Sequence, residues 1–300
     1  MREFGGTWSE SKLDCVEQYA ASYLTVMQKQ HWCRLEYVDA FAGRGLQALK
    51  SGMQADDAYG DASEQADAQE FLIGSALRAL RASDAAVRGF DSFEFIEADK
   101  ASCDELDATV TNDFPGLRSR VRVTCGDAND ALRSYVRSVG WKNRRALVFL
   151  DPFGLEVGWG LVLELAGTKA CDVWYLFPLG GVIRMMTKDG AIPDLWSTRL
   201  DALFGTHDWR QEFYQPNPQQ CLFEVEGEDL IRDASTDHVV EYVRRRLGVA
   251  FAAVSQAAIL RNSKGAPLFA LVLGVSNPSQ SAQHAALAIA NHLVKGLNEG

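Results

Sequence analysis

Four short apolar runs in this chain each end at an acidic residue, and this repeated pattern constrains the fold more than any other feature. Each run is typical of a strand in a parallel sheet that is covered on both faces. The runs are LEYVD ending at Asp39, FEFIE ending at Glu97, VRVTCGD ending at Asp127 and LVFLD ending at Asp151. Ligands of open α/β sheets bind beyond the carboxyl ends of the strands. The sequence therefore predicts four carboxylates along one ligand-binding edge.

The order of the elements predicts a doubly wound, mainly parallel α/β sheet, because helical segments separate successive strands. We expect a C-terminal antiparallel hairpin to close the sheet, with strands in 249–260 and 268–275. The 300 residues allow one large domain with an insertion. The expected parts are an N-terminal helical lid or cap at 1–33, a Rossmann-like core at 34–180, a helical insertion at 181–248, and the closing hairpin and helix at 249–300.

The net charge of −10 disfavours non-specific adhesion to nucleic acid, because that adhesion depends on neutralising phosphates. It does not exclude a local basic groove, for which the chain offers three candidate sets. The favoured interpretation of each set is a solvated helix face, a turn or the start of a strand. The sets are Arg118, Arg120 and Arg122; Lys142, Asn143, Arg144 and Arg145; and Arg244, Arg245 and Arg246.

Several features indicate a cytoplasmic protein. No stretch approaches the roughly 20 apolar residues that span a bilayer, and the N-terminus lacks the apolar core of a secretory signal. The six cysteines are scattered without a C-x-x-C pair, which favours buried thiols in a reducing compartment. The five histidines show no metal-ligand spacing, so we expect no metal site.

Acidic strand ends suit a ligand with a cationic centre and hydroxyl groups. S-adenosylmethionine is such a ligand, since it carries a sulfonium, an α-ammonium and a ribose diol. The loop from Gly43 to Ala48 also fits a relaxed dinucleotide fingerprint, G-x-G-x-x-A. A dinucleotide site would need an acidic residue about 20 residues further on, whereas Glu97 lies more than 50 residues beyond Gly45. Asp39 would also repel a pyrophosphate, so the sequence favours S-adenosylmethionine over NAD.

The predicted cofactor-binding residues are Asp39, Phe41, Gly43, Gly45, Glu97, Asp127 and Ala128. The two glycines allow a tight turn and close approach of the backbone. Asp39 supports that turn and places negative charge near the sulfonium, and Glu97 accepts hydrogen bonds from both ribose hydroxyls. Asp127 accepts from the adenine amine beside the Ala128 N–H. For Asp127 alone, a helix N-cap explains the residue equally well.

The fourth strand leads into Asp151-Pro152-Phe153-Gly154, which resembles the D-P-P-[YF] motif of amino-group methyltransferases. An exocyclic amine on a ring is a poor nucleophile, and the Asp151 side chain and Pro152 carbonyl would accept from its two N–H bonds. Phe153 would stack on a base, and a base in a duplex would first be flipped out. Phe153 replaces the second proline of that motif. A tight turn at a strand end is the alternative interpretation.

With these motifs in place, the chain resembles the three-Cys-motif partner (TcmP) family nearly from end to end. One departure is Ala76, where the family pattern predicts proline. The matching segments are Gly6-Thr7-Trp8-Ser9 with Lys12, Tyr37 to Gly43, Gly74-Ser75-Ala76-Leu77, Phe149 to Gly154, Trp159, and Leu271 to Asn277.

The resemblance implies a class I methyltransferase-like fold, a prokaryotic or phage setting, and a neighbouring gene for a protein with a three-cysteine motif. The leading hypothesis is a methyltransferase that uses S-adenosylmethionine to modify an amino nitrogen of a nucleobase in nucleic acid. One alternative is a non-catalytic, methyltransferase-like scaffold for the three-cysteine partner. Another is a small-molecule or protein methyltransferase, which the acidic net charge makes easier to accept.

Overall fold

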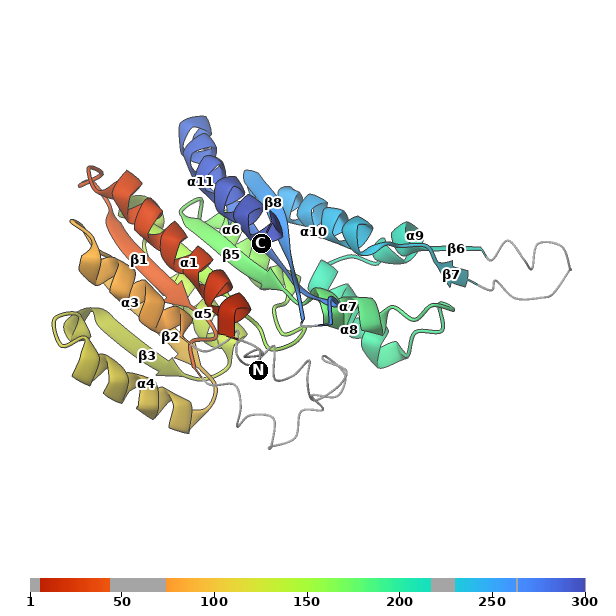
Figure 1. Ribbon diagram of the computed structural model, residues 1–300, viewed down its shortest axis with the longest axis horizontal. Coiled ribbons are helices and arrows are strands. Elements are labelled where there is room, and N and C mark those ends of the chain that lie inside the picture. The colour runs from red at the N-terminus through yellow and green to blue at the C-terminus, as the bar shows by residue number, and fades with distance from the viewer. Residues whose placement is uncertain (1–5, 44–73, 217–229, 263, 300) are drawn as a thin grey trace, which may run out of the picture.

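Seven strands form one sheet in the described part of the chain (Figure 1). The computed structural model describes residues 6–43, 74–216, 230–262 and 264–299, without the side chains of 6–13 and 299. The sheet order is β3-β2-β1-β4-β5-β9-β8. The strands are β1 (Arg34–Asp39), β2 (Ser92–Glu97), β3 (Val121–Cys125), β4 (Arg144–Leu150), β5 (Cys171–Phe177), β8 (Ala253–Arg261) and β9 (Pro267–Val275).

Strands β1 to β5 pair in parallel, and β9 runs antiparallel to both of its neighbours, β5 and β8. This strand order, with one reversed strand next to the edge, is that of the class I methyltransferase fold. The fold is a Rossmann-like sheet extended by an antiparallel C-terminal hairpin, so the predicted fold class is confirmed.

The two central strands, β1 and β4, are buried on both faces beyond their first residues. Leu35, Tyr37 and Val38 are fully buried. Glu36 lies among them and is also fully buried; its carboxylate accepts hydrogen bonds from Arg144 and the Tyr135 hydroxyl. A buried carboxylate needs such partners, because an unpaired charge in the interior is strongly destabilising.

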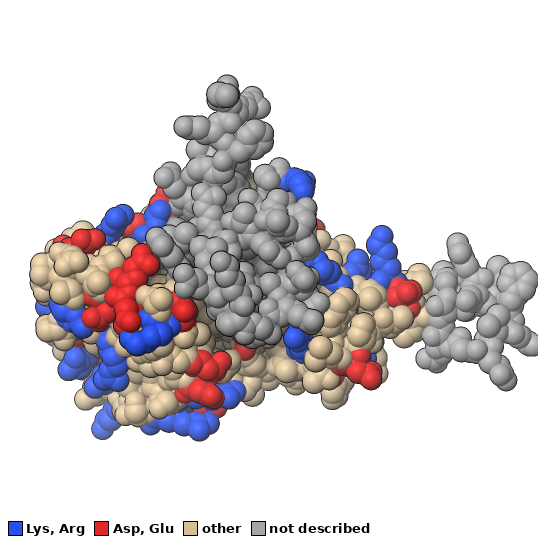
Figure 2. All heavy atoms as spheres, turned by 90° about the horizontal axis from the view of Figure 1, so that it is seen from below, with Lys and Arg blue, Asp and Glu red and all other residues tan. Residues whose placement is uncertain are grey.

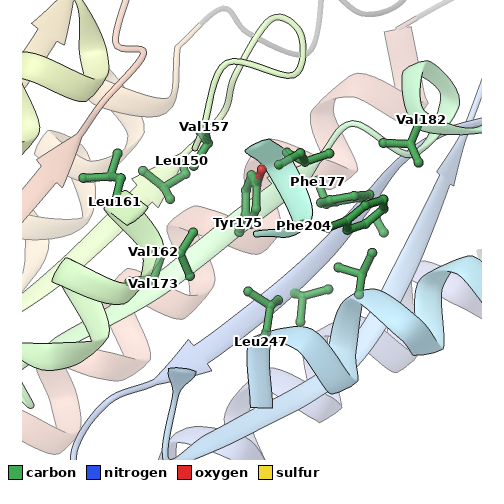
Figure 3. Close-up of a cluster of buried hydrophobic side chains, with 14 of the residues drawn as sticks. Leu150, Val157, Leu161, Val162, Val173, Tyr175, Phe177, Val182, Phe204 and Leu247 are labelled. Carbon is green, nitrogen blue, oxygen red and sulfur yellow. The ribbon is translucent and has the colours of Figure 1, made fainter. Parts of the chain in front are cut away.

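Helices cover both faces of the sheet. On one face, residues of α1 (Gly6–Met27), α3 (Ser75–Ala85), α4 (Lys100–Asp113) and α11 (Gln280–Glu299) join a single apolar core with the strands. On the other face, α5 (Ala128–Ser138), α6 (Trp159–Gly167), α7 (Leu179–Met185) and α10 (Thr236–Ala250) contribute to a second core. Figure 3 shows part of the second core, where Phe177 and Phe204 lie close to Val182.

The chain between β5 and α10 adds a small unit beside the second core. It contains α8 (Asp194–Phe204), α9 (Trp209–Phe213) and a two-stranded antiparallel sheet of β6 (Tyr214–Pro216) and β7 (Leu230–Arg232). Phe204 anchors this unit, since its ring lies 6.1 Å from the Phe177 ring and 5.2 Å from the Tyr242 ring. Figure 1 shows β6 and β7 extending away from the main sheet.

The structure differs from the sequence-based prediction in two places. Val249 and Ala250 end helix α10, and the first hairpin strand begins only at Ala253. The segment 181–248, which was expected to be helical, also contains the short strands β6 and β7. Short strands escape a pattern search because three residues show no clear alternation.

Two short 3-10 helices, Arg118–Arg120 and Trp141–Asn143, lead into β3 and β4. Among the described residues, no helix has the length and apolar character needed to cross a membrane. Of the cysteines, Cys15, Cys33, Cys103 and Cys171 are buried free thiols and Cys125 is an exposed one, while Cys221 lies outside the described residues.

Candidate functional site

Three of the four strand-end carboxylates lie on one face of the sheet, on the adjacent strands β2, β1 and β4. Asp39 is in register with Phe95 of β2 and Phe149 of β4. Glu97 and Asp151 each follow those phenylalanines by two residues, which returns their side chains to the same face about 7 Å further along. Asp39 therefore sits deeper in the sheet, between two carboxylates nearer its edge.

Asp39 is fully buried and holds the turn that follows β1. Its Oδ1 accepts a hydrogen bond from the Phe41 N–H at 3.1 Å, and its Oδ2 accepts one from the Ser75 hydroxyl at 2.6 Å. Burial raises the pKa of Asp39 from 3.8 to about 6; the hydrogen bonds from Ser75 and Phe41 oppose the rise, and Glu97 adds to it. The site thus contains a carboxyl group poised to titrate near neutral pH.

Glu97 connects the loops that follow β1 and β2. Its Oε2 accepts from the Gly43 N–H at 3.0 Å and its Oε1 accepts from the Asp99 N–H at 2.8 Å. A Cβ atom on Gly43 would lie 3.0 Å from Glu97 Cγ, so only glycine allows this approach without displacement. Each carboxylate oxygen can accept two hydrogen bonds, which leaves acceptor capacity for two ligand hydroxyls.

Asp151 and Pro152 are buried where β4 ends, and Phe153 is half-buried. Burial, followed by the nearby carboxylates of Asp39 and Asp151, raises the pKa of Tyr37 well above 10. The Phe153 ring packs against the first core. Phe41, the other predicted aromatic, packs against the second core instead.

Asp127 is exposed and caps helix α5, accepting a hydrogen bond from the Asp130 N–H at 3.0 Å. Ala128 is the first residue of that helix and is buried. The prediction that Asp127 is a helix N-cap is therefore confirmed. The helix N-terminus still presents this carboxylate one strand away from Glu97, because Cys125 of β3 pairs with Glu97.

Glu156 is a fifth carboxylate at this edge, which the sequence search missed. Burial, then the charges of Asp127 and Glu97, raise its pKa, and a hydrogen bond from the Phe153 N–H opposes the rise. Its backbone carbonyl accepts from Asn129 Nδ2 at 2.8 Å, which joins the loop after β4 to helix α5. The one sequence signal for Glu156 is its closeness to Asp151, which it follows within the same loop. No apolar run precedes it, however, so the strand-end pattern did not include it.

One predicted residue, Gly45, lies outside the described residues, as does most of the loop after Gly43. Figure 2 views the molecule from below the orientation of Figure 1, the side toward which β1 ends. On this face, Asp and Glu side chains lie next to the grey residues, with Lys and Arg side chains among them.

All three basic sets make contacts within the chain; in the set before β4, Arg144 pairs with Glu36 and Arg145 lies over the Trp32 ring. Arg118 pairs with Asp107 and Arg122 lies near the buried Glu94. On α10, Arg245 pairs with Glu212, while Arg246 donates to the Phe204 carbonyl and lies 4.7 Å over the Trp159 ring. These positions agree with the favoured interpretation, since the first set lies at the start of β3 and the last set lies on helix α10.

No family model and no curated protein matches this chain. Among solved structures, the fold is similar to protein LPL1258 from Legionella pneumophila str. Philadelphia 1, family-model DUF519. The two share 13% sequence identity at a TM-score of 0.44, over 96% of this chain and 93% of that chain. At this level of similarity the strand order, and not the comparison, defines the fold class.

Proposed function

We propose that this protein is a methyltransferase that uses S-adenosylmethionine to modify an amino nitrogen of a nucleobase in nucleic acid. The observation that carries the proposal is the placement of Asp39, Glu97 and Asp151 on one face, at the carboxyl ends of three adjacent strands. That edge is where open α/β sheets bind ligands. A cationic ligand with hydroxyl groups suits three carboxylates better than any anionic ligand does.

The chemistry of the available groups fits this cofactor. Glu97 has two oxygens with spare acceptor capacity for a pair of hydroxyls, and its backbone contacts fix their direction. Asp39 supplies negative charge from deeper in the sheet, and hydrogen bonds from Ser75 and Phe41 hold its carboxylate in place. S-adenosylmethionine, when bound, would supply an electrophilic methyl group.

Asp151 and Pro152 would act on the acceptor. The Asp151 carboxylate and the Pro152 carbonyl accept from the two N–H bonds of an amine, which concentrates the nitrogen lone pair in the direction of the methyl group. Phe153 lies in the same loop, where Asn129 and Glu156 hold the backbone. These groups orient and polarise the target nitrogen, and such positioning is a large part of catalysis.

The first test is a calorimetric titration of the protein with S-adenosylmethionine. Glu97→Ala should weaken binding about ten- to a hundredfold, since charge-assisted hydrogen bonds are worth roughly 1.5–3 kcal/mol each. Glu97→Gln, which removes only the charge, should also weaken binding. Its matched control is Glu241→Gln, because Glu241 is exposed on α10 and pairs only with Arg244 in the described structure. Equal affinities in wild type and both Glu97 variants would remove Glu97 from the cofactor site.

The second test measures transfer of a labelled methyl group to nucleic acid. Asp151→Asn should abolish transfer while S-adenosylmethionine affinity changes by no more than about threefold, the pattern of a lost transition-state interaction. Methylation that persists in Asp151→Asn would contradict the assigned role.

A second candidate is a scaffold that binds a partner with a three-cysteine motif, as the resemblance to the TcmP family implies. The position of Phe153 favours the scaffold, because its ring packs against the first core and is therefore less free to stack on a base. Co-purification with the partner, without transfer to any nucleic acid, would support the scaffold. A cytoplasmic location is part of both proposals, since four thiols are buried and unpaired.

A further inference from the structure

A polar pocket lies at the opposite edge of the sheet from the carboxylate site, where β1, β2 and β4 begin. It has a volume of about 470 Å³ and is lined by three short segments that precede these strands. Arg34 at the start of β1 and Asp39 at its end are separated by about 17 Å of extended chain. The pocket is therefore distinct from the carboxylate site. Its lining residues are His31, Trp32, Cys33, Arg34, Arg88, Asp91, Gly140, Asn143 and Arg144.

Trp32 is the one aromatic residue among the large apolar side chains that the described structure exposes, and 52% of it is accessible. Its ring lies 4.6 Å from the Arg145 guanidinium, a cation–π contact, and its Nε1 donates to Gln30 at 3.0 Å. Arg145 covers part of the ring and leaves the rest open. Exposing so large an apolar surface costs free energy, and a flat partner that stacks on the ring would recover it.

The loop that carries Trp32 is held in place before any ligand binds. Arg88 donates to the carbonyl oxygens of Met27, Gln30 and Cys33, at 3.1, 2.9 and 2.6 Å. The first of these carbonyls belongs to the last residue of α1, and the other two lie in the turn that leads to β1. A binding surface that is already ordered loses less entropy when its partner arrives.

Positive charge is concentrated around the pocket although the whole protein is acidic. Arg34 and Arg144 are neighbours on the parallel strands β1 and β4, and adjacent like charges repel. Buried Glu36 neutralises Arg144, whereas Arg34 is exposed and forms no ion pair with any described residue. Lys142, exposed just before β4, adds a further positive charge.

We propose that this pocket binds single-stranded nucleic acid, with a base stacked on Trp32 and phosphates held by Arg34 and Lys142. An exposed ring beside cations is the combination that binds single strands without sequence preference. The site goes beyond the proposed function and does not depend on it, because binding here is independent of methyl transfer.

The test is fluorescence anisotropy of a short labelled oligothymidylate at low and moderate salt. Trp32→Ala should weaken binding about tenfold, while Trp32→Phe keeps most of the affinity, because stacking needs only an aromatic ring. Arg34→Ala and Lys142→Ala should each weaken binding several-fold and reduce the salt dependence by about one released counterion.

The controls remove the same chemical groups elsewhere on the surface. Arg137→Ala deletes an exposed arginine of α5 whose partner is Glu164, and Leu195→Ala deletes an exposed apolar side chain of α8; neither should change the affinity. Trp32→Ala should bind S-adenosylmethionine as tightly as the wild type, so failure of the proposed methyl transfer remains separate from failure of this site.

Three outcomes would overturn the proposal. The first is a wild-type protein that does not bind the oligonucleotide, or Trp32 and Arg34 variants that bind as tightly as wild type. The second is equal affinity for the matching duplex, which would indicate charge attraction without stacking. The third is displacement by thymidine monophosphate as strong as by the oligonucleotide, which would indicate a mononucleotide site.

Discussion

Asp39 combines complete burial with a pKa raised to about 6, chiefly by desolvation. Compared with the unfolded chain, the folded protein favours the protonated form of Asp39. The stability that this protonated form contributes is fully present below about pH 4. That stability is lost as the pH rises through about 6. A nearby cation would reverse the preference, because an opposite charge favours the ionised carboxylate.

This leads to a prediction about the pH dependence of ligand binding. The affinity for S-adenosylmethionine should rise between pH 5 and 7, by at most roughly tenfold per pH unit, because the bound sulfonium drives proton release from Asp39. S-adenosylhomocysteine, whose sulfur is neutral, should show a weaker rise. Calorimetric titrations of both ligands over this pH range give the ratio of the S-adenosylmethionine affinity to the S-adenosylhomocysteine affinity.

The ratio isolates the sulfonium, since the two ligands share the amino acid, ribose and adenine groups. Asp39→Asn should make the ratio independent of pH. A ratio that stays constant in the wild-type protein would mean that the sulfonium does not lie near Asp39.

At the scale of single elements, the loop after β1 is tied to the end of β2 through Gly43 and Glu97. Gly43→Ala should place a Cβ atom 3.0 Å from Glu97 and push that carboxylate aside. We expect S-adenosylmethionine affinity to fall several-fold with little loss of stability, as measured by calorimetry and thermal unfolding. Gly126→Ala is the control, because a Cβ there meets nothing within 4 Å at the end of the next strand.

Helices α6 and α8 meet at Gly205, which ends α8 with φ +64°. A Cβ atom there would lie 2.0 Å from Trp159 Cδ1. Gly205→Ala should therefore lower the melting temperature, by strain of about 1 kcal/mol or more from φ alone plus the overlap. Gly248→Ala should raise it slightly, since Gly248 is exposed inside α10 with open space around it, and alanine is the better helix former by roughly 0.5–1 kcal/mol. Melting temperatures that move in the same direction would contradict this assignment.

The strands could be predicted from the sequence because short apolar runs end at the acidic residues Asp39, Glu97 and Asp151. The partners of these carboxylates could not be predicted. Ser75 lies 36 positions from Asp39 and Gly43 lies 54 positions from Glu97, so only the folded chain brings them together. Glu156 was missed for the related reason that a loop residue carries no periodic signal.

At the scale of the whole molecule, the sheet separates two apolar cores, and the unit formed by α8, α9, β6 and β7 depends on the second one. Phe204 is buried between Phe177 of the sheet and Tyr242 of α10. The added unit should therefore unfold together with the sheet, in one transition.

Phe204→Ala should lower the free energy of unfolding by about 3–5 kcal/mol, because it leaves a cavity where three elements meet. Chemical denaturation followed by both tryptophan fluorescence and circular dichroism measures the effect. Leu195→Ala, on the exposed side of the same helix, should change stability by less than about 0.5 kcal/mol. Separate transitions by the two probes would show that the added unit unfolds independently.

Strands β1 and β4 each begin at an arginine and lead to a carboxylate. Arg34 and Asp39 are the first and last residues of β1, and Arg144 begins β4, which Asp151 follows directly. Such a sheet carries an electric dipole along its strands, in addition to the net charge. A polyanion exerts a torque on this dipole and turns the arginine edge toward itself before contact, since fields of this kind act over several ångströms of solvent. If the pocket beside Trp32 binds nucleic acid as proposed, the protein would approach it in a defined orientation, with its acidic edge pointing away at the first encounter.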